Sequence, residues 1–152
     1  MKKEINVDEV ENYARELYLG GFSCSEALVA AFVEKLELSV PVDVIKMASG
    51  FSGGVGNTGC VCGALSGGVM ALGLLFGRSD LESDAMETRS FAKELHDYFK
   101  EKAGKKVVCC RILTRGLDLS KGEHKSQCVD YVGMVARKAV EMTAQRLDLV
   151  IK

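Results

Sequence analysis

The chain has 152 residues, a length typical of one domain and sufficient to bury a hydrophobic core. Hydrophobic residues make up 47% of it and charged residues 27%, which excludes extensive intrinsic disorder. Twenty basic and 21 acidic residues give a net charge of -1, without the basic excess of nucleic-acid-binding proteins. The six cysteines are too few for a small disulfide scaffold but more than packing alone requires.

The N-terminal residues contain two lysines, but acidic residues follow at once and no apolar core succeeds them. This pattern does not predict a signal peptide. We therefore expect a cytoplasmic protein, in which thiols are normally kept reduced. Cysteines in that compartment more often carry metal or redox chemistry than structural disulfides.

Helical signals dominate the first half of the chain. Apolar residues recur with helical spacing over residues 7–19, and Gly20 is expected to end this helix. Ser23 and Glu26 stand at capping-box spacing and predict the start of a second helix. Pro41 predicts a short third helix that runs to about residue 48.

The second half continues this pattern after a glycine-rich loop at residues 50–59. An apolar helix is expected from about residue 60 to 76, followed by a polar helix from 80 to about 103. A short helix over residues 106–116 and a long one over residues 123–149 complete the prediction. No alternating pattern predicts a strand.

The segment from Met47 to Gly77 contains no charged residue, and its apolar part is long enough to span a bilayer. Its many glycines, and the lack of an aromatic belt or basic flanks, favour a central helix of a bundle instead of a membrane span. Its small residues allow close helix packing and give a weak indication of a homodimer. We therefore predict an all-α, single-domain helical bundle over residues 1–152, with about five to seven helices around this glycine-rich apolar helix.

The cysteines lie on at least four segments, at positions 24, 60, 62, 109, 110 and 128. Cys24 is expected in the first turn of the second helix, and Cys60 and Cys62 at the start of the apolar helix. Because a helix N-terminus lowers the pKa of a thiol, Cys24 and Cys62 are the candidates for redox chemistry. No pair has C-x-x-C spacing, so a local zinc knuckle is not predicted, and a single buried cysteine can serve packing alone.

Several segments resemble a known family. They are the sequence Cys-Gly-Ala-Leu-Ser-Gly at residues 62–67, the segment 22–27 around Cys24, the glycines at 53–56, Cys110 followed by Arg111, and Cys128. In this order and spacing they resemble the C_GCAxxG_C_C family of redox-active proteins. The resemblance implies a helical domain with a cysteine redox site. The similarity to the non-haem domain of split-Soret cytochromes implies an iron–sulfur cluster, with the metal ligands Cys24, Cys62, Cys110 and Cys128.

Cys60 and Cys109 are additional to the four cysteines of the family pattern. They are candidates for alternative ligands, a second redox pair or packing. The cofactor-binding candidates are glycines whose backbone is expected to approach the cysteine site: Gly53, Gly54, Gly56 and Gly63. His96 and His124, the two histidines, are expected at the surface; the position of His124 four residues before Cys128 also allows a less favoured role as a fourth ligand or a general base.

Three functions remain open. The first is an electron-transfer protein with a [2Fe–2S]-type cluster and a redox partner protein. The second is a metal-free thiol–disulfide protein in which Cys24 or Cys62 attacks. The third is a non-catalytic protein for a thiophilic ion, zinc or copper(I), held by Cys60, Cys62 and Cys109 or Cys110. The sequence indicates no specific enzymatic reaction.

Overall fold

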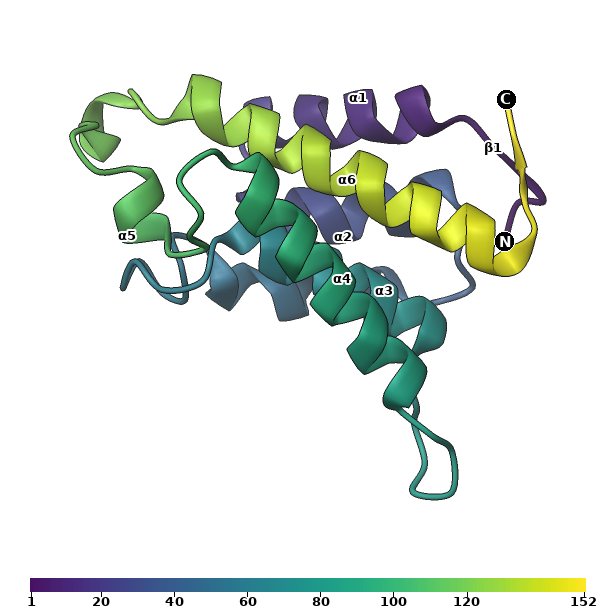
Figure 1. Ribbon diagram of the computed structural model, residues 1–152. Helices are drawn as coiled ribbons and strands as arrows, with labels where there is room; N and C mark the ends of the chain where they lie inside the picture. Colours follow the sequence, from purple (N-terminus) through teal and green to yellow (C-terminus); the bar gives the residue numbers. More distant parts are fainter.

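The computed structural model describes residues 1–152 and confirms the all-α prediction (Figure 1). Six α-helices and two 3₁₀ helices make up the bundle, and two short strands join its termini. The elements in chain order are β1 (Glu4–Ile5), α1 (Val7–Leu19), α2 (Cys24–Lys35), η1 (Val42–Phe51), α3 (Gly63–Phe76), α4 (Met86–Lys102), α5 (Cys110–Leu113), η2 (Leu119–Lys121), α6 (Lys125–Leu147) and β2 (Val150–Ile151).

α1 and α6 run side by side in opposite directions, and both pack on α2 (Figure 1). The strands β1 and β2 pair in parallel beyond their ends, with Glu4 opposite Val150 and Ile5 opposite Ile151. Two-residue strands are too short to leave an alternating sequence pattern, which is why the sequence did not predict them. This pairing fixes the N- and C-termini at one end of the bundle.

α2 and α3 are the innermost helices. Every residue from Ala27 to Val33 of α2 is buried, and no residue of α3 is exposed. α2 begins with the predicted capping box, in which the Ser23 hydroxyl accepts from the Glu26 N–H and the Glu26 carboxylate accepts from the Ser23 N–H. None of the helices is long and apolar enough to cross a membrane.

The small residues of α3 serve packing inside the bundle. A Cβ atom at Gly67 would lie 2.7 Å from the carbonyl oxygen of Ser25, and one at Gly68 would lie 2.8 Å from the Cδ2 of Leu95. Glycines at these positions therefore let α2 and α4 approach α3 closely. The small-residue spacing is accounted for by these internal contacts, so it no longer supports the predicted homodimer.

Two helix starts were predicted too early. α3 begins at Gly63, because residues 60–62 are extended and pair with residues 108–110: Cys62 N donates to Val108 O at 2.7 Å, and Cys110 N donates to Cys60 O at 2.6 Å. α4 begins at Met86, not at residue 80. The Asp80 carboxylate accepts from the N–H groups of Glu82 and Ser83, which holds that segment in a turn.

Three other elements also differ from their predicted ranges. The helix expected at 106–116 is the single turn of α5, because Val107 and Val108 lie in the extended segment. The helix after Pro41 is a 3₁₀ helix and extends to Phe51. The last helix ends at Leu147, since Asp148 adopts a left-handed conformation.

Candidate cysteine redox site

Four of the six cysteines lie at the starts of four helices. Cys24 is the first residue of α2, Cys62 is the N-cap of α3, Cys110 is the first residue of α5, and Cys128 is the fourth residue of α6. All four helix starts lie toward the end of the bundle opposite the chain termini (Figure 1). Helix direction in the bundle therefore gathers residues that are more than 100 positions apart in the sequence.

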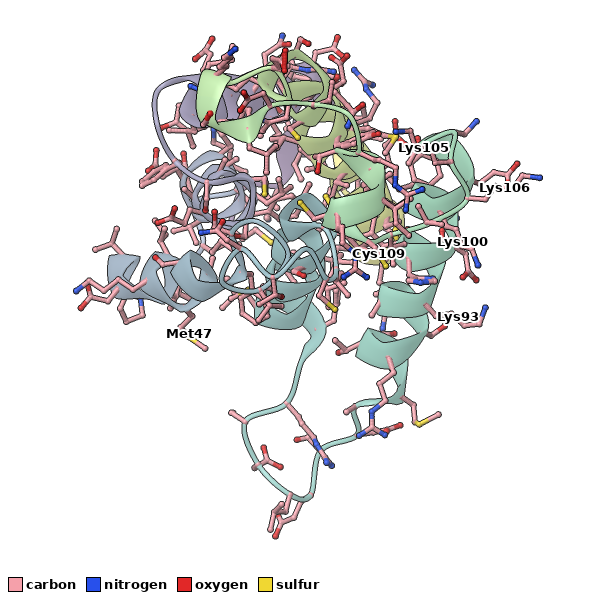
Figure 2. All side chains as sticks on the ribbon, turned by 90° about the vertical axis from the view of Figure 1, so that its left-hand side faces the viewer. Met47, Lys93, Lys100, Lys105, Lys106 and Cys109 are labelled. Atoms are coloured by element: carbon pink, nitrogen blue, oxygen red, sulfur yellow. The ribbon has the colours of Figure 1, made fainter.

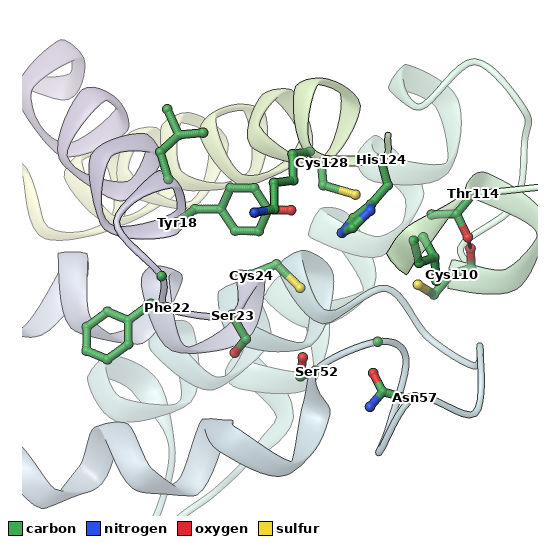
Figure 3. Close-up of a pocket in the computed structure, with 15 residues that line it drawn as sticks. Tyr18, Phe22, Ser23, Cys24, Ser52, Asn57, Cys110, Thr114, His124 and Cys128 are labelled. Atoms are coloured by element: carbon green, nitrogen blue, oxygen red, sulfur yellow. Dashed lines mark hydrogen bonds between the residues drawn. The ribbon is translucent and has the colours of Figure 1, made fainter. Parts of the chain in front are cut away.

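A cavity of about 350 Å³ lies at these helix starts. Cys24, Cys110 and Cys128 line it, and their sulfur atoms point into it (Figure 3). Cys62 is buried next to these residues, with 6% of its surface exposed. The charges of Cys24 and Cys128 raise the pKa of its thiol, and the charge of Cys110 raises the pKa values of Cys24 and Cys128, so the four thiols are close enough to influence one another.

Glycines allow this close approach. A Cβ atom at Gly63 would lie within 3.0 Å of the Cys24 sulfur, and one at Gly54 would lie 2.9 Å from the Cβ of Cys110. The backbone N–H of Gly53 faces the Cys24 sulfur and lowers the pKa of that thiol. Gly56 has a positive φ of 58° but no neighbour that a Cβ would meet. Three of the four predicted glycines therefore adjoin the cysteines, and Gly56 does not.

Burial raises the pKa of each of these four thiols. Burial first, and the charges of neighbouring cysteines second, raise the pKa of Cys62 to about 12 and that of Cys128 to about 11. The pKa values of Cys24 and Cys110 are also raised, mainly by burial. Without a bound cation the site therefore holds neutral thiols near pH 7.

This result corrects the expectation that helix starts would make Cys24 and Cys62 thiolates. The N–H groups of Ala64 and Leu65 do lower the pKa of Cys62, and those of Cys24 and Ser25 do the same for Cys24. Desolvation is larger in both cases, so the net shift is upward. The positive helix ends are present, but they need a cationic group in the cavity before the thiolates become stable.

Cys60 and Cys109 lie on the neighbouring extended segments instead of in the cavity. Cys60 is exposed and Cys109 is partly exposed. Val61 and Cys109 form an isolated antiparallel bridge, which connects the segment before α3 to the segment before α5. Cys60 and Cys109 therefore lie in the two paired extended segments that position Cys62 and Cys110.

His124 was expected at the surface, but it lines the cavity between Cys110 and Cys128 (Figure 3). Its Nδ1 atom is buried and has no hydrogen-bond partner in the protein. His124 precedes α6, and its carbonyl accepts from the Cys128 N–H at 2.8 Å. The i, i+4 spacing of His124 and Cys128 is the one sequence signal that could have placed this histidine at the site. His96 is on α4 and contacts Asp97.

No three Cys, His, Asp or Glu side chains converge as ligands of a single metal ion. The sulfurs are arranged around a cavity instead of around one point. The donor set is nonetheless soft and thiol-rich, and the buried Nδ1 of His124 adds a further unsatisfied donor or acceptor.

Comparisons with known proteins identify the family of the chain. Residues 22–142 match the model of the family described as "Putative redox-active protein (C_GCAxxG_C_C)". An uncharacterized protein of Archaeoglobus fulgidus is 29% identical over 133 residues, which cover 82% of this chain and 84% of that protein. No solved structure matches the chain. Because the family model covers most of the chain, including Cys24, Cys62, Cys110 and Cys128, the chain belongs to the C_GCAxxG_C_C family of redox-active proteins.

Proposed function

We propose that this protein is a cytoplasmic electron-transfer protein that binds an iron–sulfur cluster, of the [2Fe–2S] type, through Cys24, Cys62, Cys110 and Cys128. The observation that carries the proposal is the meeting of these four cysteines from four separate helix starts: three line one cavity, and Cys62 is buried beside them. Four cysteine thiolates are the usual ligands of such clusters.

The electrostatics of the cavity fit a cluster. Several buried thiols raise one another's pKa values, so ionising all of them together is unfavourable without a compensating cation. Ferric or ferrous iron supplies that positive charge. A cluster with four thiolates would be anionic as a whole, and the positive ends of α2, α3 and α6, which begin at the cysteines, would stabilise that charge.

The spacing of the donors favours a cluster over a single ion. The thiolates of a cluster are distributed around a core larger than one ion, as the sulfurs here are distributed around a cavity. The ligands of a structural zinc ion meet at one tetrahedral centre, and no three side chains here do so. Zinc or copper binding by Cys60, Cys62 and Cys109 or Cys110 is less favoured also because Cys60 is exposed and outside the cavity.

When bound, the cluster would supply one-electron chemistry. The protein's part is to hold the thiolates, exclude water and orient backbone amides at the sulfurs. Cys62 is almost completely buried, and the N–H groups of Gly53, Ala64 and Leu65 face sulfur atoms of the site. Amides directed at cluster sulfurs are one of the means by which proteins set a reduction potential.

A metal-free thiol–disulfide function is the second candidate, and the proximity of Cys24 and Cys62 favours it. In that reaction Cys24 would attack a substrate disulfide and Cys62 would displace the mixed disulfide. Two thiols would be oxidised to one disulfide, the substrate disulfide would be reduced to two thiols, and no net protons would be consumed. The raised pKa values of both thiols make the attacking thiolate scarce near pH 7, which disfavours this candidate.

The test compares two cysteine variants that are close in sequence. Cys62→Ser should lower the iron and acid-labile sulfide content of anaerobically purified protein by about tenfold or more. Cys60→Ser should leave both near the wild-type level, because its side chain is outside the cavity. Circular dichroism on the same samples checks that both variants are folded. A folded Cys62→Ser protein with wild-type iron content would refute the ligand assignment.

A thiol titration separates the two candidates. In the cluster protein, removal of iron should expose four additional thiols without any reductant. In the disulfide protein, additional thiols should appear only after reduction, and iron should be absent from the start.

A further inference from the structure

Charge is divided unevenly along the chain. Residues 100–125 contain eight basic and three acidic side chains, a net charge of +5, whereas the remaining residues contain twelve basic and 18 acidic side chains, a net charge of -6. All eight basic side chains are exposed. We call these eight residues the basic rim: Lys100, Lys102, Lys105, Lys106, Arg111, Arg115, Lys121 and Lys125.

The basic rim is also largely without ion-pair partners. Within it, only Lys121 lies near a carboxylate, that of Asp118 at 4.0 Å. Nine of the twelve basic residues elsewhere form ion pairs. The positive charge of the rim is thus not neutralised within the protein and is available to an external anion.

Two residues of the basic rim lie at the cysteine cavity or beside it. Lys125 lines the cavity, and Arg111 lines an adjoining cleft together with Cys110. Figure 2 looks onto the end of the molecule where α5 lies and shows Lys100, Lys105 and Lys106 along one side of this face, with Cys109 nearer its middle. The basic rim therefore extends to the mouth of the cysteine cavity at Lys125 and Arg111.

Two exposed apolar side chains lie at the cavity itself. Phe22 is 39% exposed and Leu119 is 51% exposed, and both line the cavity. An apolar centre with a charged border is the usual composition of a protein–protein interface. Charges on the border of an interface mainly increase the rate of encounter and select the partner.

We propose that the basic rim is the docking surface for an acidic electron-carrier protein, which exchanges electrons with the cysteine site. The choice of an electron carrier rests on the proposed function, whereas the acidic character of the partner rests on the charge of the rim alone. A protein partner fits better than a nucleic acid, because the remaining surface carries a net charge of -6 and repels a long polyanion. A compact acidic protein contacts the rim without meeting that surface.

The test uses the full chain, labelled with ¹⁵N and titrated with a plant-type ferredoxin as the acidic one-electron carrier. At about 20 mM salt, amide shifts should be confined to residues 100–125 and the cavity mouth, and they should weaken strongly at about 300 mM salt. The triple variant Lys106→Glu, Arg115→Glu, Lys121→Glu should weaken binding by about tenfold or more. None of these three residues lines the cavity.

A matched control makes the same change of net charge elsewhere. Lys3, Arg78 and Arg89 are exposed, belong to no ion pair and lie outside the rim, so changing all three to Glu should alter the affinity by less than about twofold. The proposal would be overturned if both triple variants weakened ferredoxin binding equally. Amide shifts outside residues 100–125 and the cavity mouth, or no binding at low salt, would also overturn it. Displacement of the ferredoxin by an equal concentration of duplex DNA would overturn it in favour of a nucleic-acid partner.

Iron content measured on the same samples tests the cluster separately. Rim-specific binding by protein that stays free of iron after anaerobic reconstitution would refute the cluster and retain the docking surface. Iron-loaded protein that does not bind the ferredoxin would refute the docking surface and retain the cluster.

Discussion

At the end of the bundle where the chain termini meet, charged groups satisfy one another, whereas at the cysteine end they do not. Between α1 and α6, Glu11 accepts from both Arg15 and Arg137, and Arg137 also contacts Asp8 near the start of α1. The strands β1 and β2 close the same end. At the cysteine end, four thiols have raised pKa values, the Nδ1 of His124 has no partner, and the basic rim has almost no carboxylates.

This difference assigns stability mainly to the end with the chain termini and function to the cysteine end. Unsatisfied buried polar groups and unpaired like charges cost free energy of folding. Proteins retain such groups where something binds. The ion pairs between α1 and α6 stabilise the fold and so offset part of the free-energy cost at the cysteine end. The following changes test that division.

The largest expected effect comes from the glycine closest to a cysteine sulfur. Gly63→Ala should lower the free energy of unfolding by about 1–3 kcal/mol and reduce iron content, because the added Cβ would displace Cys24. Gly73→Ala is the matched control in the same helix. No atom lies within 4 Å of a Cβ there, so that variant should be unchanged or more stable by up to about 1 kcal/mol. Chemical denaturation measures both, and equal effects of the two changes would contradict the crowding of Gly63 against Cys24.

The next largest expected effect is a dependence of the free energy of unfolding on pH. The pKa of Cys62 is raised from 9.0 to about 12 in the folded protein, so the folded state holds this proton more tightly than the unfolded chain. The resulting stability is fully present below about pH 9 and should be lost progressively as the pH rises toward 12 in iron-free protein. Cys62→Ser should flatten this profile.

Metal binding should have the opposite dependence on pH. Binding requires thiolates and releases thiol protons, so affinity should increase as the pH rises from 7 to 9. A proton-release measurement during anaerobic reconstitution checks this directly. Binding without proton release would mean that the thiols are already ionised.

A smaller effect is expected at the opposite end. Glu11→Gln should lower the free energy of unfolding by about 1–2 kcal/mol, because the Glu11 side chain is only 15% exposed and its carboxylate contacts two arginines. Its iron content should be unchanged. Glu16→Gln, on the exposed side of the same helix, should stay within about 0.5 kcal/mol of wild type. Loss of iron in Glu11→Gln would show that the two ends are coupled.

The smallest expected effect is an increase in the free energy of unfolding, whereas the preceding variants lower it. His124→Leu removes a buried nitrogen without a partner, so iron-free protein should become more stable by about 1 kcal/mol. The same variant should bind iron less tightly if the nitrogen contacts the bound group. His96→Leu is the control, since His96 is partly exposed and bonded to Asp97. Destabilisation of iron-free His124→Leu would show that this nitrogen is already satisfied.

Local signals predicted much of this fold. The capping box at Ser23 and Glu26 located the start of α2, and the glycine at position 20 located the end of α1. The predictions failed where contacts between distant segments decide the structure. Residues 60–62 are extended because they pair with residues nearly 50 positions later, which no local pattern reveals.

The site was less accessible to sequence reasoning. The spacing of the six cysteines alone did not distinguish Cys110 from Cys109, and the four-cysteine set came from the family resemblance. The structure separates these cysteines because strand pairing leaves Cys60 outside the cavity while α5 turns Cys110 into it. Burial also reversed the expected direction of the thiol pKa shifts, since desolvation depends on the whole bundle.

The measurement closest to the central claim is an absorption spectrum of anaerobically purified protein, combined with iron and acid-labile sulfide assays. A cluster held by the four cysteines predicts broad visible bands and about two iron and two sulfide per chain. A colourless protein that stays free of iron and sulfide after anaerobic reconstitution would contradict the claim.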